Sequence, residues 1–246
     1  MSYKQEDILG VPVDILTMSD IKRDLLTYFE ENKKMTLTSV NPQILLMAEQ
    51  NEKVKEFVKN STHKFPDGIG LVKVSKWTKG KIKTRVAGIE VMHEVLHFAN
   101  EHHKRIFLLG AKPEVAQRAS ENIARDFPNL TVAGWIDGYT KMSDHDIVSK
   151  MNQAQTDMVF VAMGSPKQEE WLQNNLSVLN AIVYQTVGGS LDVISGTVKR
   201  APEFFIKTNL EWLYRSCANP KRFYRIFQLP VFVLKALSWH RKNGEH

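Results

Sequence analysis

The stretch that decides the fold is DMVFVAMGSPKQEE, residues 157–170. Residues 158–163 are all apolar, which is typical of a strand buried on both faces of a parallel sheet. Gly164, Ser165 and Pro166 then interrupt the apolar run, and a helix is expected from Lys167 onward. A strand that leads through a short turn into a helix is the beginning of a βαβ unit.

The same alternation continues in both directions from this stretch. Strands are expected at residues 35–40, 105–110, 130–135 and 181–187, and helices at about 43–60 and 113–126. We therefore predict an α/β fold, with a Rossmann-like, mostly parallel sheet and helices on both faces. Ligands of such sheets bind beyond the carboxyl ends of the strands. This rule points to the segments that follow Gly110, Gly164 and Gly188.

The composition excludes several classes of protein. The chain has 246 residues, of which 43% are hydrophobic and 24% charged, so it is neither a low-complexity nor a disordered sequence. A single cysteine excludes a disulfide framework and a cysteine-based structural zinc site. The N-terminus does not resemble a secretory signal, and no apolar run reaches the ~20 residues that span a bilayer. We therefore expect a cytoplasmic protein.

The charge divides the chain into two parts. Residues 196–246 carry 10 Lys and Arg against 3 Asp and Glu, whereas residues 1–195 are almost neutral. The C-terminal part also holds 9 of the 23 aromatic residues. We predict an α/β catalytic core at 1–195 and a basic, aromatic-rich helical appendage at 196–246. Such an appendage suits an anionic membrane surface or single-stranded nucleic acid, or it packs on the core as an ordinary amphipathic helix.

Two motifs suggest a metal but have simpler interpretations. His93 and His97 match the HExxH pattern of zinc hydrolases, yet they also fit the polar border of an amphipathic helix. Asp144 and Asp146 match the DxD pattern of metal-dependent sugar-nucleotide enzymes. Ser143 precedes them with the spacing of a helix cap, and the cap is the stronger interpretation. No GxGxxG or P-loop motif follows a predicted strand, so dinucleotide and P-loop enzymes lose their main support.

Three polar positions in or next to predicted loops have two interpretations each. Asp67 lies in a tight turn between Pro66 and Gly68, where it could act as a general base or cap the next helix. Asn41 could contact a ligand or form an Asx turn. Gln168 lies at a helix N-terminus that could bind an anion or be a simple connection.

These loops form an ordered set of motifs: Ser39–Pro42, Pro66–Gly70, Arg85–Gly88, Arg105–Ala111, Gly164–Glu169, Gly188–Gly196, Lys199–Pro202 and Leu210–Arg215, with Pro220, Arg222 and Arg225. The set resembles the WecG/TagA/CpsF glycosyltransferases from about residue 8 to about residue 230. Within that family the sequence is most similar to the N-acetylmannosaminyltransferases that act in wall teichoic acid synthesis.

The resemblance implies an inverting transfer of N-acetylmannosamine from UDP-ManNAc to the 4-hydroxyl of GlcNAc on undecaprenyl diphosphate, with a β linkage. It implies no metal and no cofactor. It also implies a role for individual residues. Asp67 corresponds to the catalytic base, and the substrate-binding residues correspond to Ser39, Asn41, Arg85, Gln168, Arg215, Arg222 and Arg225. Ser39 stands where the family often has threonine.

The implied partners are the UDP-sugar donor, the lipid-linked acceptor and the inner face of the cytoplasmic membrane, to which the protein would bind peripherally. Nucleic acid is not among them, and the sequence leaves a homo-oligomer open. Two alternatives remain. One is a non-catalytic membrane or nucleic-acid binding module that uses the basic tail, and the other is a zinc hydrolase built on His93 and His97.

Overall fold

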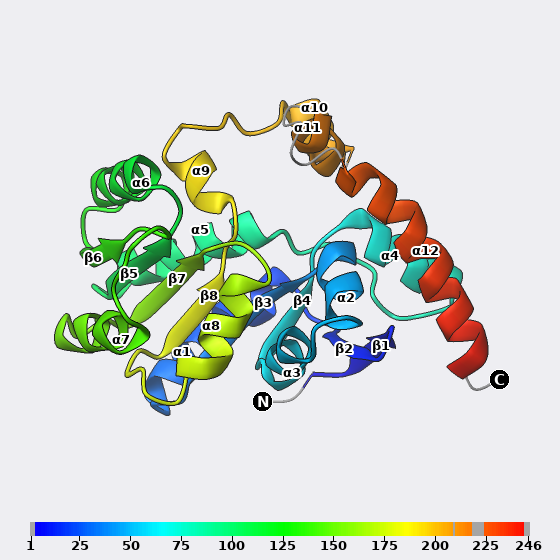
Figure 1. Cartoon of the computed structure of the whole chain (residues 1–246), viewed down its shortest axis with the longest axis horizontal. Helices are drawn as coiled ribbons and strands as arrows, with labels where there is room; N and C mark the ends of the chain where they lie inside the picture. The colour runs from blue at the N-terminus through cyan, green and yellow to red at the C-terminus, as the bar shows by residue number, and fades with distance from the viewer. Residues whose placement is uncertain (1–2, 209, 218–223, 244–246) are drawn as a thin grey trace.

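The computed structural model describes residues 3–208, 210–217 and 224–243, with side chains except at residues 206, 207, 215–217, 224 and 225. Within these ranges the centre is a six-stranded sheet in which every neighbouring pair of strands is parallel (Figure 1). Its order is β4 (His63–Pro66), β3 (Met35–Val40), β8 (Val183–Thr186), β7 (Met158–Ala162), β5 (Arg105–Gly110) and β6 (Thr131–Ile136). The predicted α/β fold is confirmed.

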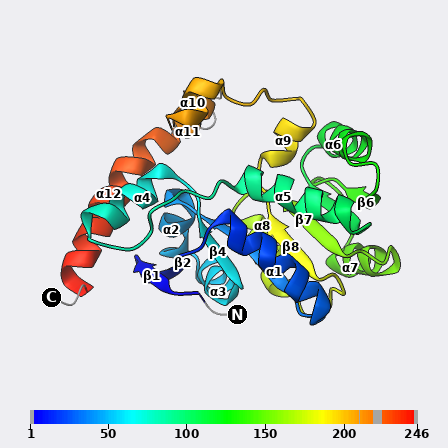
Figure 2. The same ribbon diagram turned by 180° about the vertical axis from the view of Figure 1, so that it is seen from behind.

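Helices cover both faces of the sheet because successive strand residues point to opposite sides. In β5, Phe107 and Leu109 join one hydrophobic cluster, whereas Ile106 and Leu108 join the other. Figures 1 and 2 show the two layers from opposite sides. The first layer contains α2 (Pro42–Ala48), α3 (Glu52–Asn60), α7 (Asp144–Gln153) and α8 (Lys167–Asn175). The second contains α1 (Met18–Glu30), α5 (Gly88–Glu101), α6 (Pro113–Asp126) and α9 (Ser190–Ile194).

One helix that we expected at about 43–60 is instead two helices. Asn51 accounts for the break, because its side-chain oxygen accepts a hydrogen bond from the Val54 N–H and so caps the start of α3. Asn41 caps α2 in the same way through the Ile44 N–H. Asparagine favours such caps over a helix interior, and this explains why the apolar pattern alone was misleading.

A short antiparallel hairpin lies beside β4 at one edge of the sheet. It consists of β1 (Gln5–Ile8) and β2 (Val11–Asp14). The Asp14 carboxylate accepts a hydrogen bond of 2.7 Å from the backbone N–H of Lys64 in β4. The hairpin therefore shields part of an edge that would otherwise be open for pairing.

The C-terminal part leaves the sheet at the end of α9 and returns across the molecule. It contains α10 (Glu203–Lys207), α11 (Glu211–Cys217) and α12 (Tyr224–Asn243), and α12 packs against α2 and against α4 (Ile69–Trp77) (Figure 1). Phe232 and Ala236 of α12 are fully buried and belong to the same cluster as one sheet face. None of the helices in the described ranges is long and apolar enough to cross a bilayer.

Candidate active site

A cavity of about 340 Å³ lies at the carboxyl edge of the sheet. Loops that follow four strands contribute to its lining: Asn41 follows β3, Asp67 follows β4, Ser165 follows β7 and Gly188 follows β8. This is where ligands bind in open α/β sheets. Of the three segments that the sequence indicated, those after Gly164 and Gly188 line the cavity.

The segment after Gly110 is not part of the cavity lining, so this expectation was wrong. Gly110 is required for packing. Its φ is +112°, and a Cβ atom placed there would lie 2.5 Å from the backbone carbon of Ala162 in the neighbouring strand. The glycine thus permits a close approach of β5 and β7, and this role gives the same sequence signal as a ligand-binding turn.

Asp67 lines the cavity and is held from two directions. Its Oδ2 accepts a hydrogen bond of 3.1 Å from the backbone N–H of Gly88, the first residue of α5. Its Oδ1 accepts one of 3.2 Å from Nε of Arg85. The side chain of Asp67 is 21% exposed. A carboxylate that is fixed at a cavity wall and still reachable suits proton transfer to or from a bound molecule.

The environment of Asp67 makes it a stronger base than an aspartate in water. Burial raises the pKa of Asp67 above its usual value, and the charge of Glu211 raises it further. The Arg85 guanidinium and the Gly88 N–H act in the opposite direction but do not cancel the effect of burial on this pKa. A base with a raised pKa lies nearer the optimum for catalysis at neutral pH.

The alternative interpretation of Asp67, as the cap of the following helix, is wrong. Helix α4 begins after Gly68, which provides no side-chain hydrogen bond to it. The Asp67 carboxylate reaches instead to the start of a different helix, α5. Asn41 caps α2 and also lines the cavity, as does Ser39 in β3, so the ligand contact of Asn41 stays a prediction.

Gln168 lines the cavity but both ends of its amide are engaged by the protein. Its Oε1 accepts a hydrogen bond of 3.2 Å from the Gly188 N–H, and its Nε2 donates one of 2.7 Å to Glu169. The same Glu169 oxygen accepts a hydrogen bond from the Ser165 hydroxyl. Gln168 therefore joins the loops after β7 and β8. Glu169 is fully buried, and burial raises the pKa of its carboxyl group.

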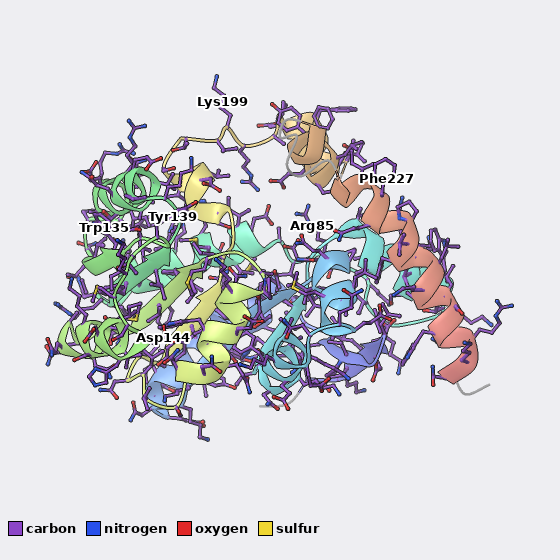
Figure 3. The ribbon with its side chains drawn as sticks, viewed as in Figure 1. Arg85, Trp135, Tyr139, Asp144, Lys199 and Phe227 are labelled. Carbon is purple, nitrogen blue, oxygen red and sulfur yellow. The ribbon has the colours of Figure 1, made fainter. Side chains whose placement is uncertain are left out.

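The C-terminal helices contribute residues to the cavity to which sequence analysis assigned no role. These residues are Glu211, Trp212, Gln228 and Leu229. The Oε2 atom of Glu211 lies 3.6 Å from Nη2 of Arg85, so Arg85 connects this carboxylate to Asp67. Figure 3 shows Arg85 between the sheet edge and the C-terminal helices. Trp212 Nε1 and Gln228 Oε1 are buried and find no hydrogen-bond partner among the described residues.

The three arginines that we expected at the site are not placed by the structure. Arg222 lies outside the described residues. The backbones of Arg215 and Arg225 belong to α11 and α12, but their side chains lie outside the described part. Their roles stay predictions.

The two metal-like motifs are both parts of ordinary helices. Ser143 caps α7 by accepting a hydrogen bond of 3.1 Å from the Asp146 N–H, which confirms the cap. His97 lies in α5 and packs edge-on against Phe127, with 5.1 Å between the ring centroids. In the ranges that the structure describes, no three His, Cys, Asp or Glu side chains come together as a metal-binding group.

The arrangement of polar loops around the cavity agrees with a comparison of sequences. The profile of the family described as glycosyl transferase WecG/TagA/CpsF matches residues 6–246. This chain belongs to that family. The resemblance noted in the sequence is confirmed, and membership of the WecG/TagA/CpsF family makes the protein a glycosyltransferase rather than a zinc hydrolase or a binding module.

Individual relatives carry a more specific name. A Staphylococcus aureus protein (strain NCTC 8325 / PS 47) is 35% identical over 238 residues, which cover 96% of this chain and 93% of the relative. A Bacillus spizizenii protein (strain ATCC 23059 / NRRL B-14472 / W23) is 37% identical over 219 residues, covering 89% of this chain and 85% of the relative. Both are named N-acetylglucosaminyldiphosphoundecaprenol N-acetyl-beta-D-mannosaminyltransferase.

Proposed function

We propose that this glycosyltransferase moves N-acetylmannosamine from UDP-ManNAc to the 4-hydroxyl of GlcNAc on undecaprenyl diphosphate, with inversion and a β-1,4 linkage. The reaction would build the linkage unit of wall teichoic acid. The names of the two relatives support this choice of sugar and acceptor. The observation that carries the proposal is the Asp67 carboxylate, which is held at the cavity wall by Gly88 and Arg85.

Asp67 is the general base of the proposed reaction. The 4-hydroxyl oxygen of the acceptor attacks the anomeric carbon of the donor, and Asp67 takes the hydroxyl proton as the new C–O bond forms. The bond from the anomeric carbon to the UDP oxygen breaks on the opposite face, which inverts the configuration. General-base assistance of this kind typically accelerates a reaction by ~10²–10⁴.

The departing UDP carries a growing negative charge that must be stabilised. The charged side chains that line the cavity, among those described, are Asp67, Arg85 and Glu211, so this wall has one cation against two carboxyl groups. Further positive charge is needed for a diphosphate. Arg215, Arg222 and Arg225 would supply it from the appendage, because guanidinium groups match phosphate oxygens in charge and geometry.

The appendage also has an apolar surface that suits a lipid-linked acceptor. On α12, Phe227, Val231 and Leu234 follow one another at helical spacing, and each is 46% or more exposed. They lie on the helix face opposite Phe232 and Ala236, which are buried. An exposed apolar face on a basic segment binds anionic membranes. We place the protein peripherally on the inner face of the cytoplasmic membrane.

The proposed function is tested by incubating the protein with UDP-ManNAc and a short-chain GlcNAc diphospholipid. UDP release is followed with and without EDTA, and NMR of the product gives its anomeric configuration. We expect a β-linked disaccharide lipid and the same rate with EDTA. UDP-GlcNAc serves as the control donor and should react at least about tenfold more slowly, because the contacts that recognise one C2 epimer do not fit the other.

A rate that EDTA abolishes would contradict metal-free stabilisation of UDP. An α-linked product would contradict direct displacement. Equal rates with both donors would contradict the assignment of the sugar.

A further inference from the structure

A buried acid from the C-terminal part reaches the proposed catalytic base through one arginine. Glu211 is the first residue of α11 and is only 4% exposed. Burial of a carboxylate costs free energy unless the charge finds a partner. The partner of Glu211 is Arg85, whose Nη2 atom lies 3.6 Å from Glu211 Oε2.

The same guanidinium also holds Asp67. Arg85 donates from Nε to Asp67 Oδ1 at 3.2 Å, so its two ends face carboxylates from two different regions of the chain. A guanidinium is planar, so a carboxylate on one side fixes the direction of its other N–H groups. The side chain of Arg85 is 20% exposed. Without Glu211 it would have room to turn toward the cavity.

This inference rests on the proposed function of Asp67. We propose that Glu211 is a positioning residue of the transfer reaction: its carboxylate holds Arg85 against Asp67, so that the base is fully arranged only when α11 lies over the cavity. The lipid-linked acceptor then meets a complete site only in the closed arrangement. Glu211 itself does not contact the reacting atoms.

The proposal makes the pH dependence of transfer a specific readout. The charged groups that face Asp67 in the described structure are Arg85 and Glu211. The backbone N–H of Gly88 also donates a hydrogen bond to Asp67. Loss of the Glu211 charge alone would lower the pKa of Asp67, but movement of Arg85 away from Asp67 removes a larger influence that lowers this pKa. The proposal therefore predicts a net rise in the pKa of Asp67, so that Asp67 becomes protonated at a higher pH than in the wild-type protein.

The first experiment compares Glu211→Gln with the wild-type protein. We expect kcat for UDP release to fall about tenfold or more, as for a small displacement of a catalytic group, with little change in KM for UDP-ManNAc. We also expect the acidic limb of the pH profile to move to higher pH. The matched control is Lys235→Met. Lys235 connects α12 to Glu49 by an exposed ion pair with an N···O distance of 2.7 Å, and neither residue lines the cavity. It should leave the pH profile unchanged.

An unchanged kcat and pH profile in Glu211→Gln would overturn the proposal. So would a shift of the acidic limb to lower pH, because that is the result expected if Arg85 keeps its place beside Asp67 without Glu211. If Glu211→Gln loses all transfer at an unchanged melting temperature, the second experiment decides whether the loss comes from the contact between Arg85 and Glu211.

The second experiment does not require activity. Hydrogen exchange of the peptides that cover α11 is measured in Arg85→Met, in Glu211→Gln and in the double variant. If the two side chains act on each other, each single variant speeds exchange and the double variant exchanges no faster than the faster single variant. Independent, additive effects would contradict the proposal. If the wild-type protein showed no transfer but this coupling were present, the proposed function would fail while the Arg85–Glu211 contact stood.

Discussion

The sheet edge and the C-terminal helices form two walls of one cavity, and different contacts hold each wall. On the sheet side, hydrogen bonds to backbone groups fix the side chains, as between Asp67 and Gly88 and between Gln168 and Gly188. On the appendage side, the contacts are side-chain packing and ion pairs, such as Arg85 with Glu211 and Lys235 with Glu49.

This difference separates two tasks of the proposed reaction. A proton acceptor must be placed to within a fraction of an ångström, and rigid elements are best able to do this. A lipid-linked substrate must enter and leave, which requires a wall whose contacts can open at small cost. We therefore expect the base at the sheet edge and the residues that would close over the substrate in the appendage.

The largest loss of transfer is expected when the whole appendage is removed. A fragment of residues 1–195 should lose transfer by at least about 10³-fold, since it lacks Glu211 and the three arginines proposed to stabilise UDP. It should still fold, with a lower melting temperature, because the α2 and α4 surfaces that cover Phe232 become exposed. UDP release and thermal melting by circular dichroism measure the two effects. A fragment with full activity would show that the second wall is unnecessary.

A substitution at one glycine should disturb the contact between the two walls, at the point where α4 meets α12. A Cβ atom at Gly70 in α4 would lie 2.5 Å from Leu229 Cδ1 in α12, so Gly70→Val must displace the Leu229 side chain and disturb its packing between α4 and α12. Such overpacking typically costs ~1–3 kcal/mol, and we expect transfer to fall about tenfold as the second wall shifts. Lys73→Val is the matched control, because Lys73 is exposed on the same helix. Equal transfer rates in the two variants would contradict a role for the α4–α12 contact.

The Glu169→Gln variant tests the sheet side of the cavity by its effect on the melting temperature. Burial raises the pKa of Glu169 in the folded protein, so the stability associated with its protonated form is lost as the pH rises through this raised value. Glu169→Gln removes the charge and keeps the oxygen that accepts from Ser165 and Gln168. We expect a higher melting temperature than wild type at pH 8 and the same one at pH 4. A variant that is less stable at pH 8 would show that the ionised carboxylate stabilises the loop.

The smallest effect is expected at the exposed ion pair between Lys235 and Glu49. Lys235→Met should change the free energy of unfolding by ~0–1 kcal/mol, as is usual for surface pairs. Double-variant analysis with Glu49→Gln, at low salt and in 1 M NaCl, measures the coupling between the two side chains. A coupling above about 2 kcal/mol, or one that salt does not weaken, would place this pair among the structural supports of the appendage.

Local patterns in the sequence predicted most of the sheet side. The expected strands at 35–40 and 105–110 and the helix at 113–126 match β3, β5 and α6 at both ends. Continuous apolar runs and a proline in the first helical turn are signals that depend only on neighbouring residues. Asn41 was found because it follows such an apolar run, whereas Asp67 was found from the turn residues Pro66 and Gly68, although β4 itself was not predicted.

The appendage side of the site was not predictable in this way. Gln228 reaches the cavity because α12 packs across α2 and α4, a contact between residues far apart in the sequence, and Glu211 reaches it from α11, which packs against α12. The apolar spacing of α12 does not show which helix it will cover. The hairpin at 5–14 was missed as well, although its alternating residues around Gly10 are a hairpin signal. The loop after Gly110 was misassigned because a glycine for packing and a glycine for a ligand give the same signal.

The most direct test of Asp67 as the base is the rate of transfer by Asp67→Asn beside its affinity for UDP-ManNAc, measured by calorimetry. We expect kcat to fall by ~10²–10⁴ while the affinity changes less than about threefold, because asparagine keeps the shape of the side chain but cannot accept a proton. In the wild-type protein, transfer should rise with pH through the raised pKa of Asp67, since only the ionised carboxylate can act as a base. Unchanged turnover in Asp67→Asn would contradict the assignment of Asp67.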